Sequence, residues 1–498
     1  MHRSTRSAID LATLFGGRWP ELADRSRRCL QDVVRLVEQF LDRGVTPTTT
    51  CQFEHALREL LQRFGRTTLE WTVNQLEPEA LPAHARLDGE CYRLRPKSPR
   101  RSLDSLFGPV RLWRYRYEAL ELGEPSRFPL EEQLGIEAQR ATPALAERAA
   151  WWSVGQTQAQ VLTILRRDHG VSWSVQTLRQ VTQSMSAGMV EHREAAQVAK
   201  LQTWLQQAQA AGGPHRPVLS VGRDGVMVPL RHETDYREAA AGTLSVIDGH
   251  GQRVGTVYLG RMPEKYQKTL SRQMTSLILQ VLAVLTGALP RLHYVSDGGS
   301  EPTRYFRQVL RKLCDPRHPG RLLRWTRVID FYHACGYITK MSQAFIGQVP
   351  DGIASWARKM RHWLRDKRNG VFRVLHSAAA LRSRSRRHWT RAETETFQDG
   401  YRYLRKRKPF MDYAAYRARG LPIGSGVTEA ACKTVFTQRL KQSGMTWEIE
   451  GGQVIVDLRT IWLSHVWDEV HGAYLAAKPL LKLGTQQGNP PRILQIAA

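Results

Sequence analysis

The sequence predicts a multidomain protein that is mainly α-helical, with one α/β core that contains a mixed five-stranded sheet and is interrupted by an all-α insertion. Three observations lead to this fold class. Most of the chain carries apolar residues at three- and four-residue steps, the period of an amphipathic helix. Residues 206–347 instead alternate between strand-like and helix-like stretches. A basic helical stretch, 348–420, separates them from the second part of the core at 421–475.

The first part of the chain predicts two small structural parts. Residues 1–90 form an N-terminal helical segment, because stretches such as 30–44 and 53–65 show helical periodicity. From 91 to 140 the pattern changes to alternation, as in GPVRLWRYRY, where arginines separate apolar and aromatic residues. This alternation predicts a small basic β-element.

Residues 141–205 predict a helix-turn-helix DNA-binding domain. Three helical stretches follow one another here, and Gly170 lies in the turn before the third. Ser174 is a good cap for that third helix, which would enter the DNA groove. Its exposed face would carry Gln176, Thr177, Arg179 and Gln180. The alternative is an ordinary helical bundle with a solvated polar face, and the glycines and proline of 206–217 predict a domain boundary.

The core predicts the element order βββαβαβα. Its expected elements are strand 217–230, a hairpin over 241–260, helix 271–287, strand 291–297, helix 301–313, strand 322–330 and helix 333–347. The three strands that precede the first helix form an antiparallel meander. The two later strands are joined by helical crossovers and must run parallel, with right-handed connections. The sheet is therefore expected to be mixed.

Three acidic residues stand at places where this core would bring them together. Asp224 lies in the first strand, Asp297 closes the fourth, and both precede glycine. If these strands pair, the two carboxylates meet at one sheet edge. Glu429 begins a later helix, 429 − 297 = 132 positions downstream, behind the glycine-rich turn LPIGSG. Each acid also has a structural alternative, since Asp-Gly is common in turns and acids favour the first helical turn.

Converging carboxylates predict a divalent metal site. Three such groups repel one another unless cations lie among them, and hard oxygen ligands suit Mg²⁺ or Mn²⁺. Two ions per active site, roughly 3.5–4 Å apart, can activate a water or a 3′-hydroxyl and stabilise the leaving oxygen of a phosphodiester. Asp224, Asp297 and Glu429 are therefore the predicted catalytic and metal-binding residues.

The charge of the chain indicates its partner. There are 73 basic and 46 acidic residues, so the net charge is 73 − 46 = +27, with a pI near 10.3. Such a surplus attracts polyanions, and double-stranded DNA is the leading partner over an anionic membrane surface. The longest uncharged apolar run, 276–290, is too short to span a bilayer. No signal peptide pattern begins the chain, so we expect a cytoplasmic protein without a membrane partner.

Basic residues near the core are candidate phosphate contacts. In the insertion these are Arg384, Arg386, Arg387, Arg405, Lys406 and Arg407. The neighbouring aromatic residues either stack on exposed bases or belong to a helical core. These are Trp363, Trp389, Tyr401 and Tyr403. Behind Glu429, a helical stripe of Lys433, Arg439 and Lys441 should face DNA, and Trp447 either stacks on a base or packs in the core.

Four stretches carry a family resemblance. They are DGVMVPL (224–230), VSDGGSEPTRYF (295–306), VIDFYHACGYI (328–338) and PIGSGVTEAACKTVFTQRLKQSGMTW (422–447). Over residues 140–470 the chain resembles bacterial insertion-sequence DDE transposases of the ISKra type, which are relatives of Mutator-like elements. The resemblance implies a ribonuclease H-like catalytic core. It also implies that Asp224, Asp297 and Glu429 are the metal-binding acids.

The resemblance assigns accessory residues as well. Asp330 and His333 match the D-x-x-H signature of such transposases. Asp330 also ends a strand and is the alternative to Asp297 as the second acid, although strand counting favours Asp297. His333 is a candidate for holding a scissile phosphate or a flipped base, or for bonding Asp330.

The expected function is that of a DNA transposase. Such an enzyme would bind the terminal inverted repeats of its insertion sequence, cleave the DNA ends with metal ions, and join them to target DNA. A homodimer or higher oligomer on DNA follows from the need to handle two ends, in a bacterial, nucleoid-associated setting. The alternatives are a catalytically silent or domesticated DNA-binding protein, and a structure-selective nuclease on the same fold. The C-terminal tail, 476–498, predicts no function.

Overall fold

The computed structural model describes residues 20–76, 82–87, 90–95, 100–121, 123–233, 235–346, 352–385, 388–442 and 444–478. The chain divides into two compact units, one from Met1 to Met185 together with Leu475–Ala498, and one from Ser186 to Tyr474. The fold is mainly helical, and the second unit contains a mixed five-stranded sheet. The sequence prediction of a mainly α, multidomain α/β protein is confirmed at this level.

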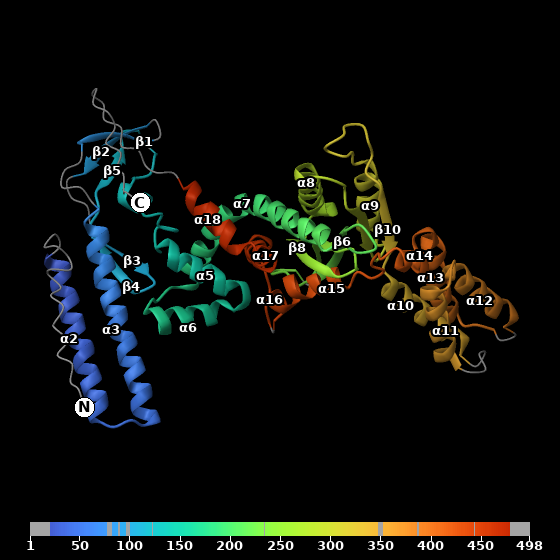
Figure 1. Ribbon diagram of the computed structural model, residues 1–498, viewed down its shortest axis with the longest axis horizontal. Helices are drawn as coiled ribbons and strands as arrows, with labels where there is room; N and C mark the ends of the chain where they lie inside the picture. The colour runs from blue at the N-terminus through green and yellow to red at the C-terminus, as the bar shows by residue number, and fades with distance from the viewer. Residues whose placement is uncertain are drawn as a thin grey trace. The chain divides into compact units, whose positions relative to one another are not determined.

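The first unit begins with two long helices. These are α2 (Pro20–Asp42) and α3 (Pro47–Asn74). They pack side by side, and the Phe40 and Phe53 rings stack with their centroids 4.6 Å apart (Figure 1). Thr46 caps α3 through its hydroxyl, and Pro47 occupies the first helical position, where its missing N–H costs nothing.

The basic β-element forms two small sheets in the same unit. A three-stranded sheet has the order β1 (His84–Leu87), β2 (Glu90–Arg95), β5 (Arg116–Ala119), and a separate hairpin joins β3 (Arg101–Ser105) to β4 (Gly108–Leu112). The alternation in β4 buries Val110 and Leu112 and exposes Arg111 between them. A short helix, α4 (Pro129–Gln133), follows.

Three further helices occupy the region predicted as a helix-turn-helix. They are α5 (Pro143–Gly155), α6 (Gln158–His169) and α7 (Val175–Ala210). Gly170 ends α6 with a φ of +64°, and the Ser174 hydroxyl accepts the Thr177 N–H at 3.0 Å, as expected for a cap. Because α7 continues to Ala210, the third helix extends well beyond the predicted recognition segment and runs from the first unit into the second.

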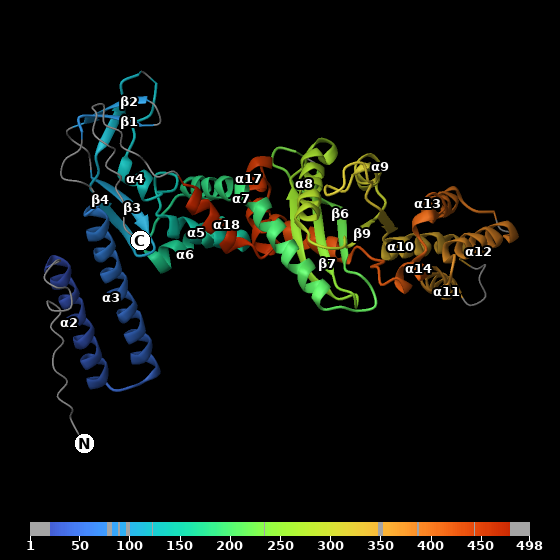
Figure 2. The same cartoon turned by 45° about the horizontal axis from the view of Figure 1, so that its top comes forward.

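The five-stranded sheet confirms the predicted element order. Its elements are β6 (Val218–Val228), β7 (Arg237–Ile247), β8 (Arg253–Arg261), α8 (Lys268–Val284), β9 (Arg291–Ser296), α9 (Ser300–Gln308), β10 (Trp325–Ile329) and α10 (Phe331–Ser342). The spatial order is β10-β9-β6-β7-β8. Strands β6, β7 and β8 are antiparallel, whereas β9 and β10 run parallel to β6 and to each other. Figure 2 shows β6, β7 and β9 of this sheet together.

Helices cover both faces of this sheet. On one face Leu219 and Val221 of β6 share a core with α8 and with the second half of α7. On the other face Ala239 and Ala241 of β7 pack with the helices that follow the glycine-rich turn. Those helices are α15 (Gly426–Ala431), the π-helical turn η5 (Cys432–Thr437), α16 (Gln438–Leu440) and α17 (Ile449–Leu463). Helix α18 (Trp467–Ala477) follows them in the chain. Each fully buried aliphatic side chain stabilises the fold by roughly 1.5–3 kcal/mol.

The stretch that was predicted as an all-α insertion contains four helices among its described residues, and they pack with α10. Its helices are α11 (Gly352–Asp366), α12 (Gly370–Arg384), α13 (Arg391–Arg407) and α14 (Tyr413–Ala418), which gather around α10 in Figure 1. Short 3₁₀ turns occur at η1 (Lys265–Gln267), η2 (Leu310–Lys312), η3 (Gln343–Phe345) and η4 (Lys408–Phe410).

The aromatic residues of the insertion form its core. The Trp389 ring meets Phe345 and Phe397 edge to face, and Tyr403 stacks on Tyr337 at 3.7 Å between centroids. Trp363 and Tyr401 are partly buried against the same core. Of the two possibilities that the sequence left open for these aromatics, burial in a helical core is therefore the one observed. Among the described residues, no helix is both long and apolar enough to cross a membrane.

Candidate active site

The strand register places three aspartates side by side at one end of the sheet. Gly222 pairs with Val295 across β6 and β9, so Asp224 and Asp297, each two residues further on, lie at the same level. Ile329 pairs with Ser296 across β10 and β9, and the Asp330 N–H donates to the Ser296 carbonyl at 2.9 Å. Neighbouring strands are roughly 4.8 Å apart. The sequence expectation that β6 and β9 are neighbours is confirmed.

A glycine in β6 allows the helix that carries Glu429 to approach the sheet. A Cβ at Gly222 would lie 1.9 Å from the Thr428 Oγ1, which is closer than any real contact. The Thr428 hydroxyl also hydrogen-bonds the Thr243 hydroxyl of β7 at 2.8 Å in a buried position. Thr428, the residue before Glu429, therefore holds the first turn of α15 against β6 and β7.

Asp330 is fully buried and holds two segments together. Its Oδ1 accepts the backbone N–H of His333 at 2.5 Å and caps α10. Its Oδ2 accepts both the backbone N–H of Ser425 and the Ser425 hydroxyl, the latter at 2.8 Å. The Ser425 hydroxyl in turn lies 3.4 Å from the Glu429 Oε1. Asp330 therefore links the end of β10 to the turn that starts the Glu429 helix.

The charges of Asp297 and Glu429 affect the pKa of the Asp224 carboxyl. Burial is the main cause that raises the pKa of its carboxyl to about 6, while the hydrogen bond from the Gly225 N–H opposes the shift. The negative charges of Asp297 and Glu429 both raise the pKa further. A carboxylate that is half-buried among like charges is a typical feature of a functional site.

The donor chemistry of the three acids fits a hard divalent cation. The Oδ1 atoms of Asp224 and Asp297 each accept a glycine N–H at 2.8 Å, from Gly225 and Gly299 respectively. In the part of the chain that the structure describes, no group of three or more His, Cys, Asp or Glu side chains is close enough to form a ready-made metal cage. Carboxylate oxygens are donors that suit Mg²⁺ or Mn²⁺, and a cation would offset the repulsion between the acids. Its binding would have to draw the carboxylates together.

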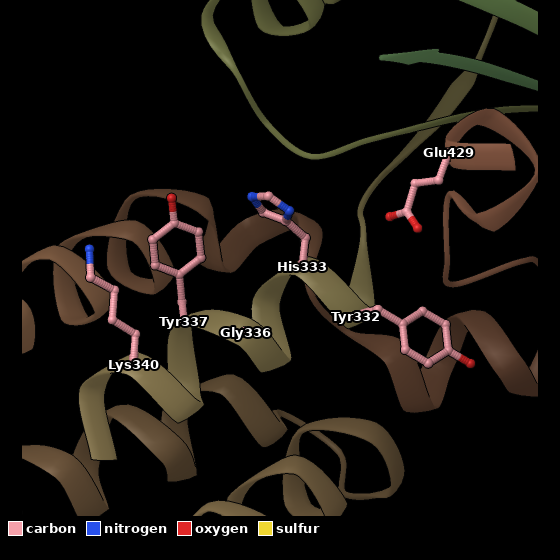
Figure 3. A pocket seen from close by; sticks show the side chains of 6 residues that line it. All are labelled: Tyr332, His333, Gly336, Tyr337, Lys340 and Glu429. Carbon is pink, nitrogen blue, oxygen red and sulfur yellow. The ribbon is translucent and has the colours of Figure 1, made fainter. Parts of the chain in front are cut away.

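An open pocket of about 430 Å³ lies between Glu429 and α10. In Figure 3 one face of α10 presents His333, Tyr337 and Lys340, and the Glu429 carboxylate lies across from the His333 ring. The His333 imidazole lines this pocket, while its backbone N–H is bonded to Asp330. Tyr332, which is 67% exposed, forms the other side.

The insertion holds the strand ends that carry the acids. The Tyr403 hydroxyl of α13 donates to the Asp297 carbonyl at 2.6 Å, and the Tyr413 hydroxyl donates to the Ile329 carbonyl at 2.9 Å. The Arg407 guanidinium donates to the Gly298 carbonyl, with Nη2 at 2.6 Å. Arg407 was predicted to contact DNA, but it is committed at least partly to the loop after Asp297. Sequence reasoning named Tyr403 only as a stacking or core aromatic, and it missed Tyr413 of α14 altogether.

Most of the other predicted DNA-binding side chains lie on the surface. On α7, Gln176, Arg179 and Gln180 are exposed, whereas Thr177 is half-buried and its hydroxyl meets Ser174. The exposed basic residues near the core are Arg384, Arg405, Lys406, Lys433 and Lys441. Arg386 and Arg387 lie outside the described residues.

The structure corrects the prediction for Arg439 and decides between the two alternatives for Trp447. Arg439 is 1% exposed and its guanidinium lies 5.2 Å from the Trp447 ring centroid, so its side chain is in the interior and not on the surface as predicted. The π-helical turn η5 adds a residue to the helix and rotates later side chains by roughly 100° relative to regular spacing. Trp447 is partly buried, and its indole N–H donates to the Leu440 carbonyl at 2.9 Å. It packs in the core.

Comparison with known proteins gives no family. No protein-family model matches the chain, and no curated protein matches it either.

Proposed function

We propose that the protein is a DNA transposase that binds the terminal inverted repeats of its own element and catalyses metal-dependent end cleavage and strand transfer. One observation carries this proposal. The register of β6 and β9 aligns Asp224 with Asp297, and the Gly222–Thr428 contact fixes the first turn of the Glu429 helix against the same strands. Asp297 and Glu429, which are 73 and 205 positions from Asp224 in the sequence, thus both act electrostatically on its carboxyl.

The sheet topology supports a ribonuclease H-like core. Three antiparallel strands followed by two parallel ones, in the order β10-β9-β6-β7-β8, agree with the fold that the family resemblance implies. Within that core, Asp297 is the better candidate for the second acid. Asp330 uses both carboxylate oxygens on protein donors, so we assign it to positioning the Ser425 turn.

Asp224, Asp297 and Glu429 would hold two Mg²⁺ or Mn²⁺ ions. When bound, such ions make a water or 3′-hydroxyl nucleophilic near neutral pH and stabilise the leaving oxygen of the phosphodiester. The chain supplies the surroundings. Asp224 must lose its proton to serve as a ligand. Because its pKa is raised to about 6, the metal-free carboxyl is mostly protonated below that pH and mostly ionised above it. His333, across the pocket from Glu429, would donate a hydrogen bond to a phosphate oxygen.

Charge and surface residues support DNA as the partner. The net charge of +27 favours a phosphate backbone through release of counterions. The capped start of α7 places Gln176, Arg179 and Gln180 on an exposed surface, which suits recognition of the repeats. Both ends of an element must be processed together, so we expect a dimer or larger assembly on DNA.

A strand-transfer assay tests the proposed function. Its substrate is a duplex that ends in the inverted repeats flanking the gene, supplied with target DNA and Mg²⁺. The wild-type protein should cleave at the repeat ends and join their 3′-hydroxyls to the target, and Asp297→Ala should abolish both steps while DNA binding persists. Cleavage of branched DNA without joining would instead identify a structure-selective nuclease. Binding without any cleavage would identify a catalytically silent DNA-binding protein.

A further inference from the structure

A strained turn at the same sheet end as the three acids exposes an aromatic ring. In η1, between β8 and α8, Tyr266 has a φ of +58° and Gln267 a φ of +46°. Two consecutive non-glycine residues rarely adopt this left-handed conformation, and it persists only where the surroundings impose it. The Tyr266 side chain is 51% exposed.

Buried hydrogen bonds impose this conformation. The Arg223 guanidinium, which is 1% exposed, donates to the Gln267 Oε1 through Nε at 2.9 Å and Nη2 at 2.6 Å. Its Nη1 donates to the Ser271 hydroxyl at 2.8 Å, and the Gln267 Nε2 donates to the Glu238 Oε1 at 2.9 Å. Gln267 is therefore held inside, and the chain directs the preceding Tyr266 outwards.

Cations surround the Tyr266 ring. The Arg304 guanidinium lies 4.9 Å from the ring centroid, and the Lys265 and Lys268 amines lie 5.4 Å and 5.9 Å from it. The ring, Arg304 and Lys268 border an open pocket of about 730 Å³, to which Arg272 also contributes. Glu301 is the acid in this pocket and pairs with Arg304 at 3.0 Å, so the local charge remains positive.

The turn leaves the sheet at the same end as the three acids. Asp224 pairs with Ala241, and Ala241 pairs with Gly260 near the end of β8, so the Tyr266 turn starts at the level of Asp224. Helix α9, which supplies Arg304, begins directly after the Asp297 loop. Successive residues of a strand point to opposite faces, so Arg223 reaches the Tyr266 turn while Asp224 serves the other face. A DNA strand that crosses this sheet end would meet both sites.

We propose that the Tyr266 pocket binds an unpaired nucleotide of the DNA strand next to the cleavage position, which rests on the proposed function. The base stacks on Tyr266, and its phosphate contacts Lys265, Lys268 and Arg304. Stacking on an aromatic ring within a positive pocket suits single-stranded DNA of any sequence, because every base has a flat face. Paired bases inside a duplex do not offer that face.

Binding to three DNA probes tests the pocket in the full-length protein. The probes are a blunt duplex, the same duplex with a short 3′ overhang of thymidines, and the overhang duplex with abasic sites in place of the thymines. Tyr266→Asn removes the ring but tolerates the left-handed backbone, and Tyr266→Phe is the matched control that keeps the ring. Tyr266→Asn should weaken overhang binding about fivefold to 150-fold, the usual effect of one stacked base.

The remaining arms decide the result. Blunt-duplex binding should be unchanged in Tyr266→Asn, Tyr266→Phe should bind the overhang like the wild type, and the abasic probe should show no effect of Tyr266→Asn. An equal loss on all three probes, or no loss on the overhang, would overturn the proposal. Photo-crosslinking of a 5-iodouracil overhang to Tyr266 provides a readout that needs no catalysis. Crosslinking to Tyr266 without metal-dependent cleavage would reject the transposase and keep the nucleotide site, whereas cleavage without crosslinking would do the reverse.

Discussion

Asp330 and Asp297 end neighbouring strands and are both followed by residues of a new helix or loop, yet their surroundings differ. Asp330 is fully buried and accepts hydrogen bonds from His333 and Ser425. Asp297 is only half-buried, and its Oδ1 accepts the Gly299 N–H of its own loop. The hydrogen bonds of Asp330 stabilise the fold, whereas Asp297 leaves its carboxylate accessible at the sheet edge.

This difference predicts unequal effects on stability. Asp330→Ala removes the acceptor of two backbone N–H groups and one hydroxyl in the interior, and should lower the free energy of unfolding by roughly 2–4 kcal/mol. Asp297→Ala should change it by less than about 1 kcal/mol. Urea denaturation of both variants measures the two values. Equal losses would contradict the division of labour between these aspartates.

The raised pKa of Asp224 predicts a pH dependence of stability. Because its pKa rises from 3.8 to about 6 on folding, the folded state favours the protonated carboxyl. The stability that protonation contributes is complete below pH 3.8 and is lost as the pH rises through about 6. Asp224→Asn should therefore stabilise the metal-free protein at pH 8 by about 1–2 kcal/mol, after allowance for solvent screening.

Thermal unfolding of Asp224→Asn and wild type at several pH values checks this prediction. The difference between them should shrink towards zero at low pH. A destabilising effect of Asp224→Asn at pH 8 would mean that the ionised carboxylate is not under strain in the fold.

Sequence reasoning singled out both aspartates but did not predict how their surroundings differ. An Asp that caps a helix and an Asp that binds a metal both occur at strand ends before turns. The partner that identifies Asp330 as a brace, Ser425, is 95 residues away in the chain. A contact of that range leaves no local pattern in the sequence.

At the scale of elements, the approach of α15 to β6 depends on Gly222. A Cβ at this position would lie 1.9 Å from the Thr428 Oγ1 and would push α15, and with it Glu429, away from the sheet. Gly222→Ala should reduce DNA cleavage about a hundredfold, since a displacement of about 1 Å can cost that much. The cleavage rate under metal saturation measures the effect.

Gly426→Ala is the matched control for Gly222→Ala. It lies on α15 itself, and a Cβ there meets nothing within 4 Å, so cleavage should stay near the wild-type rate. Circular dichroism should show that both variants retain their helices. If Gly222→Ala cleaved as fast as Gly426→Ala, the position of α15 would not control the site.

The elements themselves were largely predictable. Alternation and helical periodicity gave all five strands of the sheet, because each strand is long or bounded by glycines and loops. The contribution of the insertion was not predictable. Tyr403 donates to the Asp297 carbonyl across 106 positions, and the π-helical turn η5 turns Arg439 inwards against the regular 3.6-residue spacing. Neither feature follows from the pattern of its own helix.

At the scale of the whole molecule, the charge of +27 predicts strongly salt-dependent binding to duplex DNA. The logarithm of the binding constant should fall linearly with the logarithm of the salt concentration, by about 0.9 for each phosphate contacted. Lys433 is exposed, so Lys433→Ala should lower this slope by about one unit. Arg439 is buried, so Arg439→Ala should leave the slope unchanged while it reduces stability.

Fluorescence anisotropy over a range of salt concentrations measures the slopes. A slope change for Arg439→Ala equal to that for Lys433→Ala would mean that the Arg439 guanidinium contacts a DNA phosphate, which contradicts its assignment to the interior. An unchanged slope for Lys433→Ala would mean that Lys433 makes no phosphate contact and that the Glu429 helix is not part of the DNA-binding surface.

The central claim is that Asp224, Asp297 and Glu429 act as one metal site. Titration of the full-length protein with Mn²⁺, followed by the electron paramagnetic resonance signal of the free ion, tests it most directly. The wild type should bind Mn²⁺, and Asp224→Asn, Asp297→Asn and Glu429→Gln should each weaken binding about tenfold or more, as expected for loss of one charged ligand. Wild-type affinity in Glu429→Gln would contradict the claim, because the acid on α15 would then not share a site with the two sheet aspartates.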